Sequence, residues 1–399
     1  MIPRELHREI LELLGQAAAV VLTGPRQAGK TTIATAIASE LKGVYRDLEN
    51  PGDREQVEHI ELLIDQYPDN LIVLDEVQRA PNLFERLRGI IDRRRREGFR
   101  YGQFLLLGSA SLELLGQTSE SLAGRVSYTE LAGINLAESR NSTTPQISDS
   151  QLWLKGGLPE SHLAVDESAS IRWREDLIRS YLERDVAQFG FRVPAETMRR
   201  FWTMLAHRQG SLFNAAAIAK ALGVSGQSVA RYLDIMVDLL LVRRLPPWFA
   251  NVGKRLVKSP KVYVRDSGLL HALLDVTSIE QLLSHPVAGY SWEGFVIENL
   301  IDPGGPHRYQ PYFFRSQRGA EIDLLLVRGG VPEVAIEVKR SSNPKPEKGF
   351  LIAADDLRVK HRYLAYPGDR AYQLPDGIWA APPIDVLSAL RTRKGMSFS

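Results

Sequence analysis

The stretch from Val20 to Thr32, VVLTGPRQAGKTT, has residue types and a spacing that could bind phosphate. It fits the pattern G-x-x-x-x-G-K-[ST], in which glycines let the backbone curl so that its N–H groups point at phosphate oxygens. The helix expected after the loop would add its positive N-terminal end. We therefore predict a P-loop that binds ATP through Gly24, Pro25, Arg26, Gln27, Ala28, Gly29, Lys30, Thr31 and Thr32.

A second string, LIVLDE at 71–76, predicts how a bound nucleotide would be hydrolysed. Four apolar residues followed by two acids are typical of a buried parallel strand that delivers carboxylates at its end. Lys30 would reach the β- and γ-phosphates, while Thr31 and Asp75 would hold Mg²⁺. Glu76 would orient and deprotonate the attacking water.

Two further residues are candidates for catalytic contacts to the transferred phosphate. Ser109 follows the strand-like string QFLLLG and could touch the γ-phosphate, although a helix N-cap is the competing interpretation. Arg125 in SLAGRV could stabilise transition-state charge, either in cis or from a neighbouring subunit of a homo-oligomer. A structural salt bridge is the alternative for Arg125.

The segment 196–265 has the pattern of a winged helix. Apolar spacing predicts helices at Glu196–Arg208, Asn214–Leu222 and Gln227–Leu240, with Gly223 and Ser225 forming the turn between the last two. That order is typical of a helix-turn-helix, and strand-like segments at 241–245 and 261–265 would flank a wing. DNA contacts are expected from Gln227, Ser228, Arg231, Lys254, Arg255 and Lys258. A protein-interaction module or a rigid lid is the alternative.

The strings EIDLLL and IEVKR place Asp323, Glu337 and Lys339 on strand-like segments, after a helix predicted at 291–300. Two carboxylates at strand ends can hold a hard divalent ion. Lys339 could then position a water or neutralise a pentavalent phosphate. Glu293 would be a further metal ligand beside Asp323 and Glu337, with Glu298 the less attractive choice. Cross-strand pairs on a solvated face are the alternative.

Several of these strings resemble known families. The triplet Asp323, Glu337 and Lys339 resembles the PD-(D/E)xK nuclease core. GPRQAGKTT, LDEVQRAP, LLLGSAS and SLAGR together resemble AAA-type ATPases of bacteria and archaea, and so do the later strings GGLPE, YLERDV, VRDSGLL, EIDLLL and EVKRS. In that family the ATPase domain is joined to a C-terminal domain of unknown function with a restriction-endonuclease-like fold. The resemblance covers nearly the whole chain and implies an ATP-binding protein, but leaves its physiological role undefined.

The whole chain must position these groups, and its 399 residues suffice for two or three domains. We expect an α/β protein: a P-loop NTPase parallel sheet with flanking helices, then a winged helix-turn-helix and an α/β restriction-endonuclease-like domain. The predicted boundaries are 1–137 for the ATPase, 151–195 for a helical lid or connector, 196–270 for the winged helix and 285–399 for the nuclease-like domain.

Composition limits the partners and the compartment. The formal charge of +2 means that a nucleic-acid site must be a local patch. The chain has no cysteine, which excludes disulfides and thiolate metal sites and suits the cytoplasm. The sequence shows no apolar run of the roughly 20 residues that a membrane span needs, and no leader segment.

These features favour a Mg²⁺-dependent ATPase that couples its nucleotide state to a DNA-binding, possibly nucleolytic, module. The alternative is an ATP-dependent switch whose winged-helix and nuclease-like domains bind protein or DNA without cleavage. A metabolic kinase is a third interpretation, but the sequence has no recognisable site for a small-molecule acceptor.

Overall fold

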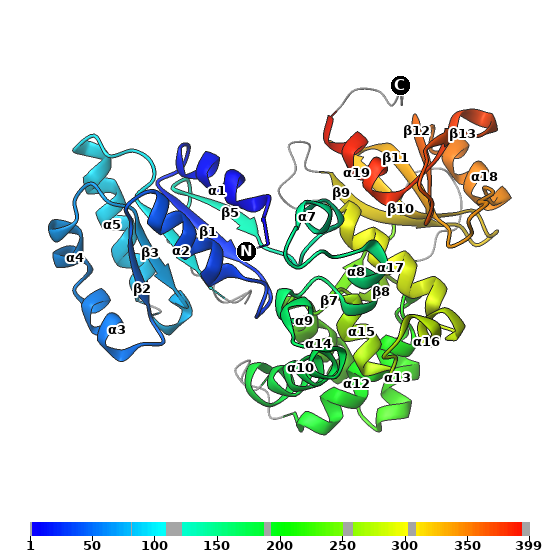
Figure 1. Cartoon of the computed structure of the whole chain (residues 1–399), viewed down its shortest axis with the longest axis horizontal. Coiled ribbons are helices and arrows are strands. Elements are labelled where there is room, and N and C mark those ends of the chain that lie inside the picture. The colour runs from blue at the N-terminus through cyan, green and yellow to red at the C-terminus, as the bar shows by residue number, and fades with distance from the viewer. Residues whose placement is uncertain are drawn as a thin grey trace. The chain divides into compact units, whose positions relative to one another are not determined.

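The computed structural model describes residues 2–80, 82–108, 122–186, 193–249, 258–301 and 309–392. The chain divides into two compact units, whose helices and strands are labelled in Figure 1. Unit 1 comprises Met1–Ile134 with Asp238–Leu240, and unit 2 comprises Asn135–Val237 with Leu241–Ser399. None of the helices in the described stretches has the length and apolar character that a bilayer-spanning segment requires.

Unit 1 is built on a five-stranded parallel sheet with the strand order β2-β3-β4-β1-β5. The strands are β1 (Ala19–Thr23), β2 (Val44–Asp47), β3 (Ile72–Asp75), β4 (Phe104–Leu107) and β5 (Val126–Glu130). The described helices are α1 (Leu6–Leu14), α2 (Lys30–Glu40), α3 (Pro51–Glu58), α4 (Ile60–Gln66) and α5 (Leu83–Arg96). The prediction of an α/β fold with a parallel sheet is confirmed.

Both faces of the sheet are buried at β1, β3 and β4, because alternate residues of these strands belong to different apolar clusters. On β1, Val21 belongs to the cluster that contains Ile60 of α4 and Ile91 of α5. Its neighbour Val20 belongs to the other cluster, which contains Ile37 of α2. A strand covered on both faces needs an unbroken apolar run, and this explains the strings that precede the P-loop and Asp75.

Unit 2 begins with a helical region followed by a small sheet. Its first helices are α7 (Leu136–Asn141), α8 (Asp149–Lys155), α9 (Pro159–Leu163) and α10 (Glu167–Ser180), which continues into a π-helical turn, η2 (Tyr181–Asp185). Then come α12 (Ala195–His207), α13 (Ala215–Leu222) and α14 (Gly226–Asp238). The antiparallel sheet has the order β6-β8-β7, from β6 (Ser211–Leu212), β8 (Lys261–Val264) and β7 (Val242–Leu245).

Local side-chain chemistry explains where α13 and α14 begin and end. The side chain of Asn214 accepts a hydrogen bond from the backbone N–H of Ala217 at 3.0 Å, which caps the start of α13. Gly223 ends that helix with a left-handed backbone, φ +71°. The hydroxyl of Ser225 then accepts from the backbone N–H of Ser228 at 3.0 Å, at the start of α14.

The C-terminal part of unit 2 is a mixed six-stranded sheet with the order β13-β14-β12-β11-β10-β9. Three helices precede it: α15 (Ser267–Leu273), α16 (Ile279–Ser284) and α17 (Ala288–Leu300). The antiparallel strands β9 (Gln310–Arg315), β10 (Glu321–Arg328) and β11 (Val331–Val338) are followed by α18 (Lys348–Asp356) and by β12 (His361–Ala365), which is parallel to β11. The chain continues with β13 (Tyr372–Gln373), β14 (Ile378–Ala381) and α19 (Pro383–Thr392).

A buried hydrogen-bond chain joins three helices of unit 2. The indole N–H of Trp153 on α8 donates to the Ser291 hydroxyl of α17 at 3.0 Å, and Ser291 Oγ lies 2.7 Å from Nε2 of His271 on α15. The other ring nitrogen, Nδ1, donates to the Leu154 carbonyl at 2.8 Å. This arrangement suits a neutral imidazole, and burial lowers the pKa of His271 to about 4.

The stability of unit 2 should therefore fall in acid through His271. Its pKa is about 6.5 in an unfolded chain and about 4 in the fold, so the unfolded chain binds more protons between these values. Lowering the pH from 7 to 5 should remove about 2 kcal/mol of unfolding free energy through this residue. The check is urea unfolding followed by tryptophan fluorescence, because all six tryptophans lie in unit 2.

The matched variant is His271→Asn, which removes the titrating ring. It should be less stable than the wild type at pH 7, but its stability should change less between pH 7 and pH 5. An equal pH dependence in the two proteins would contradict the assignment.

Candidate functional site

The P-loop of unit 1 connects β1 to α2 at the carboxyl edge of the parallel sheet. Gly24 lies so close to the chain after β5 that an added Cβ would stand 2.4 Å from the Leu131 carbonyl oxygen. Gly29 has a left-handed backbone, φ +96°, immediately before α2. Lys30 is 8% exposed, and its ammonium donates to the carbonyls of Gly24 at 2.8 Å and Pro25 at 2.9 Å. The loop thus keeps the lysine cation at the place where phosphate is expected.

The metal-binding residues predicted in unit 1 are in contact. The Thr31 hydroxyl donates to Oδ2 of Asp75 at 2.7 Å, and the Tyr45 hydroxyl of β2 donates to the same oxygen at 2.8 Å. Burial and the Asp75 charge raise the pKa of Tyr45, so the phenol stays protonated. A hydroxyl and a carboxylate at the end of β3 are the hard oxygen donors that Mg²⁺ prefers, so the residues present fit this ion.

Glu76 follows Asp75 and leaves the strand with a left-handed backbone, φ +54°. The Gln78 amide donates to its carboxylate. Burial, reinforced by the neighbouring Asp75, raises the pKa of Glu76. A carboxylate with a raised pKa is a better proton acceptor, which suits a general base.

The other P-loop residues differ in exposure. Ala28 is buried, whereas Gln27 and Thr32 are exposed and Arg26 is half-buried. Arg4, which precedes α1, donates to the Ala28 carbonyl at 2.7 Å and to the Ala132 carbonyl at 2.7 Å. One guanidinium therefore links the P-loop to the segment that follows β5. Arg4 lies in no recognisable motif, so sequence reasoning missed this role.

Arg125 cannot contact the phosphate site of its own chain. Its carbonyl accepts from the backbone N–H of Ala19, the first residue of β1, so Arg125 lies at the edge of the sheet opposite the P-loop. The length of β1 separates the two edges by about 15 Å. The Arg125 guanidinium donates two hydrogen bonds to the Asp92 carboxylate, one from Nε and one from Nη2, each 2.8 Å long. Within its own chain, Arg125 thus forms the salt bridge that was its alternative role, and a finger supplied by a neighbouring subunit stays a prediction. Ser109 lies outside the described residues.

The candidate DNA-binding residues of α14 occupy its first two turns. Gln227 and Arg231 are exposed, and Ser228 is half-buried, with its hydroxyl 2.9 Å from that of Ser225. Lys258 is also exposed. Lys254 and Arg255 lie outside the described residues.

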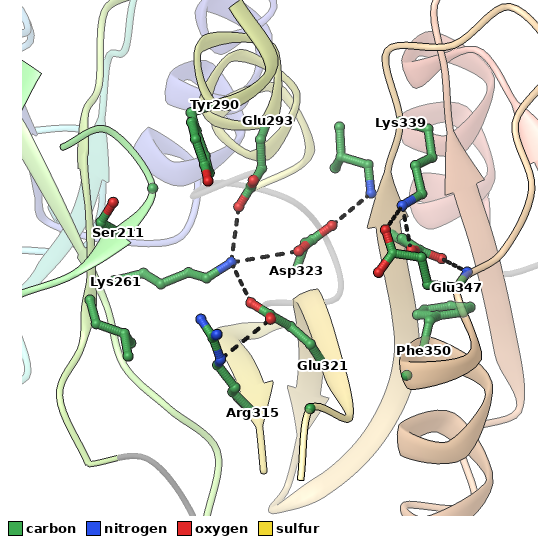
Figure 2. Close-up of a pocket in the computed structure, with 16 residues that line it drawn as sticks. Ser211, Lys261, Tyr290, Glu293, Arg315, Glu321, Asp323, Lys339, Glu347 and Phe350 are labelled. Carbon is green, nitrogen blue, oxygen red and sulfur yellow. Dashed lines mark hydrogen bonds and ion pairs between the residues drawn. The ribbon is translucent and has the colours of Figure 1, made fainter. Parts of the chain in front are cut away.

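A polar pocket of about 460 Å³ in unit 2 brings together the four residues predicted from the C-terminal motifs: Glu293, Asp323, Glu337 and Lys339. Figure 2 shows that Lys261, which the sequence analysis did not single out, reaches into this pocket from β8. Its ammonium lies 3.1 Å from Glu293, 3.0 Å from Glu321 and 3.5 Å from Asp323. These four side chains form the first charged cluster of the pocket.

Glu337 and Lys339 belong to a second charged cluster in the same pocket. The Lys339 ammonium is 2.8 Å from Oε1 of Glu337 and also pairs with Glu347. Burial raises the pKa of Glu337, although Lys339 opposes the shift. Within the described part of the chain, no group of three or more His, Asp or Glu side chains is arranged to hold a metal ion. The three predicted carboxylates thus line one pocket but do not share a cation. Glu293 and Asp323 are paired with Lys261, whereas Glu337 is paired with Lys339.

Glu298 has a separate, structural environment. It pairs with Arg243 of β7 and with Arg265, whose Nε lies 3.0 Å from its carboxylate. Burial alone would raise the pKa of Glu298, but the two arginines outweigh burial and lower it. Glu293 is the glutamate of α17 that lines the pocket.

Comparison with known families agrees with this division. The model of the AAA domain matches residues 16–139, and models of two domains of unknown function, DUF8612 and DUF4143, match residues 149–280 and 288–385. Unit 1 is thus similar to the AAA domain family over nearly all of its length.

Two curated mycobacterial proteins are similar over most of the chain. The uncharacterized proteins Rv2008c of Mycobacterium tuberculosis and Mb2031c of Mycobacterium bovis are each 42% identical over 385 residues, which is 96% of this chain and 84% of theirs. The chain belongs to the same family as these two proteins.

Solved structures with related folds are more distant. The Walker-type ATPase PABY2304 of Pyrococcus abyssi is 12% identical, with a TM-score of 0.49 over 69% of this chain and 96% of that chain. The RuvB Holliday junction branch migration motor of Thermotoga maritima is 18% identical, with a TM-score of 0.33 over 61% of this chain and 90% of that chain.

Gly24→Ala should lower nucleotide affinity at least tenfold, because the new methyl group would collide with the Leu131 carbonyl and displace the P-loop. Equilibrium binding of a fluorescent ATP analogue measures the effect. The control is Gly89→Ala on α5, where an added Cβ meets no atom within 4 Å. Wild-type affinity in Gly24→Ala would show that the close approach is unimportant.

Proposed function

We propose that the chain is a Mg²⁺-dependent ATP hydrolase whose nucleotide state is coupled to a DNA-directed module in unit 2. The observation that carries the ATPase proposal is the 2.7 Å contact between Thr31 and Asp75, beside the buried Lys30. Lys30 and Thr31 begin α2 and Asp75 ends β3, at the edge of the parallel sheet where ligands bind in such folds.

The residues of the site have distinct roles in this proposal. Lys30 would exchange the carbonyls of Gly24 and Pro25 for phosphate oxygens, so its charge is held ready beside the loop. Thr31 and Asp75 would hold Mg²⁺, which supplies charge neutralisation for phosphoryl transfer. Glu76 would take the proton of the attacking water, aided by its raised pKa.

Lys30→Ala and Glu76→Gln should both abolish ATP turnover, measured as release of free phosphate. Only Glu76→Gln should keep ATP binding close to the wild-type affinity, because it removes the base and leaves the phosphate contacts. Glu55→Gln, at an exposed position of α3, is the matched control and should hydrolyse ATP normally. Turnover retained in both site variants would refute the assignment.

For unit 2 we propose a winged helix at 196–270 and a nuclease-like domain at 285–399, joined to the ATPase domain (1–137) through a helical connector at 151–195. The capped pair α13 and α14, followed by a three-stranded antiparallel sheet, supports the winged helix. The order α17, β9, β10, β11, α18, β12 supports the nuclease-like fold. The position of Glu293, Asp323, Glu337 and Lys339 around one pocket supports it further.

The second candidate function is an ATP-dependent switch whose unit 2 binds DNA or protein without cutting. The pairing of Glu293 and Asp323 with Lys261 favours this candidate, because the lysine stands between two proposed metal ligands. Incubation of linear, circular and branched DNA with Mg²⁺ or Mn²⁺ separates the two candidates. Cleavage that Asp323→Ala and Lys339→Ala both abolish supports the nuclease, whereas intact DNA on every substrate supports the switch.

The first candidate, and the DNA-binding form of the second, predict DNA binding that weakens with salt. If α14 and the wing neutralise three or four phosphates, the logarithm of the binding constant should fall with the logarithm of salt concentration with a slope of roughly −3. Arg231→Ala should reduce that slope by about 1, and Arg370→Ala, another exposed arginine, should leave it unchanged. Fluorescence anisotropy with labelled duplexes measures both, and salt-independent binding would contradict the DNA interface.

A further inference from the structure

The first charged cluster of the unit 2 pocket contains one cation among three carboxylates. Lys261 is 4% exposed, and its ammonium lies within 3.5 Å of carboxylate oxygens of Glu293, Glu321 and Asp323. Figure 2 shows these groups converging from three elements, β8, α17 and β10. A buried charge needs such compensation, because desolvation of an isolated ion costs far more than folding can offset.

The spacing of the three carboxylates suits an ammonium group. Hydrogen bonds from an ammonium to carboxylates have lengths near 3 Å, whereas Mg²⁺ and Ca²⁺ need oxygens at about 2.0–2.6 Å. The ammonium-to-oxygen distances of 3.1 Å to Glu293 and 3.0 Å to Glu321 fall in the first class, and the 3.5 Å contact with Asp323 is a longer ion pair. Lys261 therefore occupies the centre that a metal ion held by Glu293 and Asp323 would need.

The fold fixes this lysine firmly. Lys261 is the first residue of β8, the central strand of the small sheet, and it pairs with Leu212 on β6 and Leu245 on β7. The next inward residue of β8, Tyr263, donates its hydroxyl to the same oxygen of Glu293 at 2.6 Å. The Lys261 ammonium also lies 5.7 Å from the centre of the Phe313 ring, on β9.

Its counter-charges come from a different part of the chain. Lys261 lies in the segment matched by DUF8612, whereas Glu293, Glu321 and Asp323 lie in the segment matched by DUF4143. The cation and the carboxylates are therefore contributed by opposite walls of the pocket. Withdrawal of β8 from α17 and β10 would remove the cation from the cluster and leave three carboxylates facing one another.

We propose that Lys261 is a built-in cation that occupies the divalent-metal position of the unit 2 pocket, so that Glu293, Glu321 and Asp323 bind a divalent metal only when the lysine is removed or withdrawn. This inference rests on the proposed nuclease-like domain, which is the reason for treating the pocket as a metal-binding site. It adds Glu321 to the residues that would hold the ion.

The test is Mn²⁺ binding to the full chain without nucleotide, measured by calorimetry and by the electron paramagnetic resonance signal of free Mn²⁺. Lys261→Met keeps a long unbranched side chain but removes the charge. It should bind one Mn²⁺ at least tenfold more tightly than the wild type does. Adding Asp323→Asn to Lys261→Met should abolish this gain, and Lys360→Met, at an exposed lysine of unit 2, should behave as the wild type.

Thermal unfolding gives a second readout, because Lys261→Met leaves three carboxylates uncompensated and should be less stable. Mn²⁺ should raise the unfolding temperature of this variant more than that of the wild type, since a ligand that binds only the folded state stabilises it. Tryptophan fluorescence reports the transition of unit 2. A folded Lys261→Met that gains no Mn²⁺ affinity would overturn the proposal.

The wild type alone provides a test that does not depend on the folding of Lys261→Met. Its Mn²⁺ binding without nucleotide should be unaffected by Asp323→Asn, because the lysine holds the cluster. If the wild type binds Mn²⁺ tightly and Asp323→Asn removes that binding, the proposal is overturned, even if the protein cleaves DNA. Conversely, a gain of Mn²⁺ affinity in Lys261→Met would support the proposal for Lys261 even if neither protein cuts DNA. In that case only the proposed nuclease function would be refuted.

Discussion

Burial of the unit 1 sheet on both faces is the constraint on which the ATPase site depends. Two apolar clusters cover alternate residues of β1, β3 and β4, and the carboxyl ends of these parallel strands meet at one edge. Thr31 and Asp75 come from segments 44 residues apart, yet their oxygens are 2.7 Å apart at that edge. The same constraint places Arg125 at the opposite edge, where Asp92 neutralises it.

Unit 2 is governed by a different requirement, the compensation of buried charge. Glu298 is held by two arginines, and Lys261 is held by three carboxylates. The group of Glu298 with its two arginines has excess positive charge and has a structural role. The group of Lys261 with its three carboxylates has excess negative charge and lines a cavity. This contrast distinguishes two glutamates of one helix, Glu293 and Glu298, although they are only five residues apart.

The sequence predicted those parts of the fold and sites that depend on local patterns. Apolar runs marked β1 and β3, and the Asn214 and Gly223 signals marked the ends of α13. The motif around Asp323 and Glu337 pointed to two side chains that line one pocket, whereas their predicted role as metal ligands stays a prediction. The position of Arg125 could also have been inferred, because a residue that precedes a parallel strand lies at the edge away from the ligand.

Long-range partners could not be predicted in the same way. Tyr45 donates to Asp75 across 30 residues, and Lys261 meets Asp323 across 62, but neither residue lies in a recognisable motif. Only tertiary packing decides which lysine enters a carboxylate cluster. A sequence pattern that predicts metal ligands therefore cannot predict a competing cation that another segment of the chain supplies.

The contacts of Arg4 have a practical consequence for work on the ATPase domain. This residue is close to the start of the chain, yet it joins the P-loop carbonyl of Ala28 to Ala132, two residues before the end of unit 1 at Ile134. A shortened protein that begins at α1 would retain every motif residue of the domain. It would nevertheless lack the guanidinium that fixes the loop, so its nucleotide affinity would not represent that of the full chain.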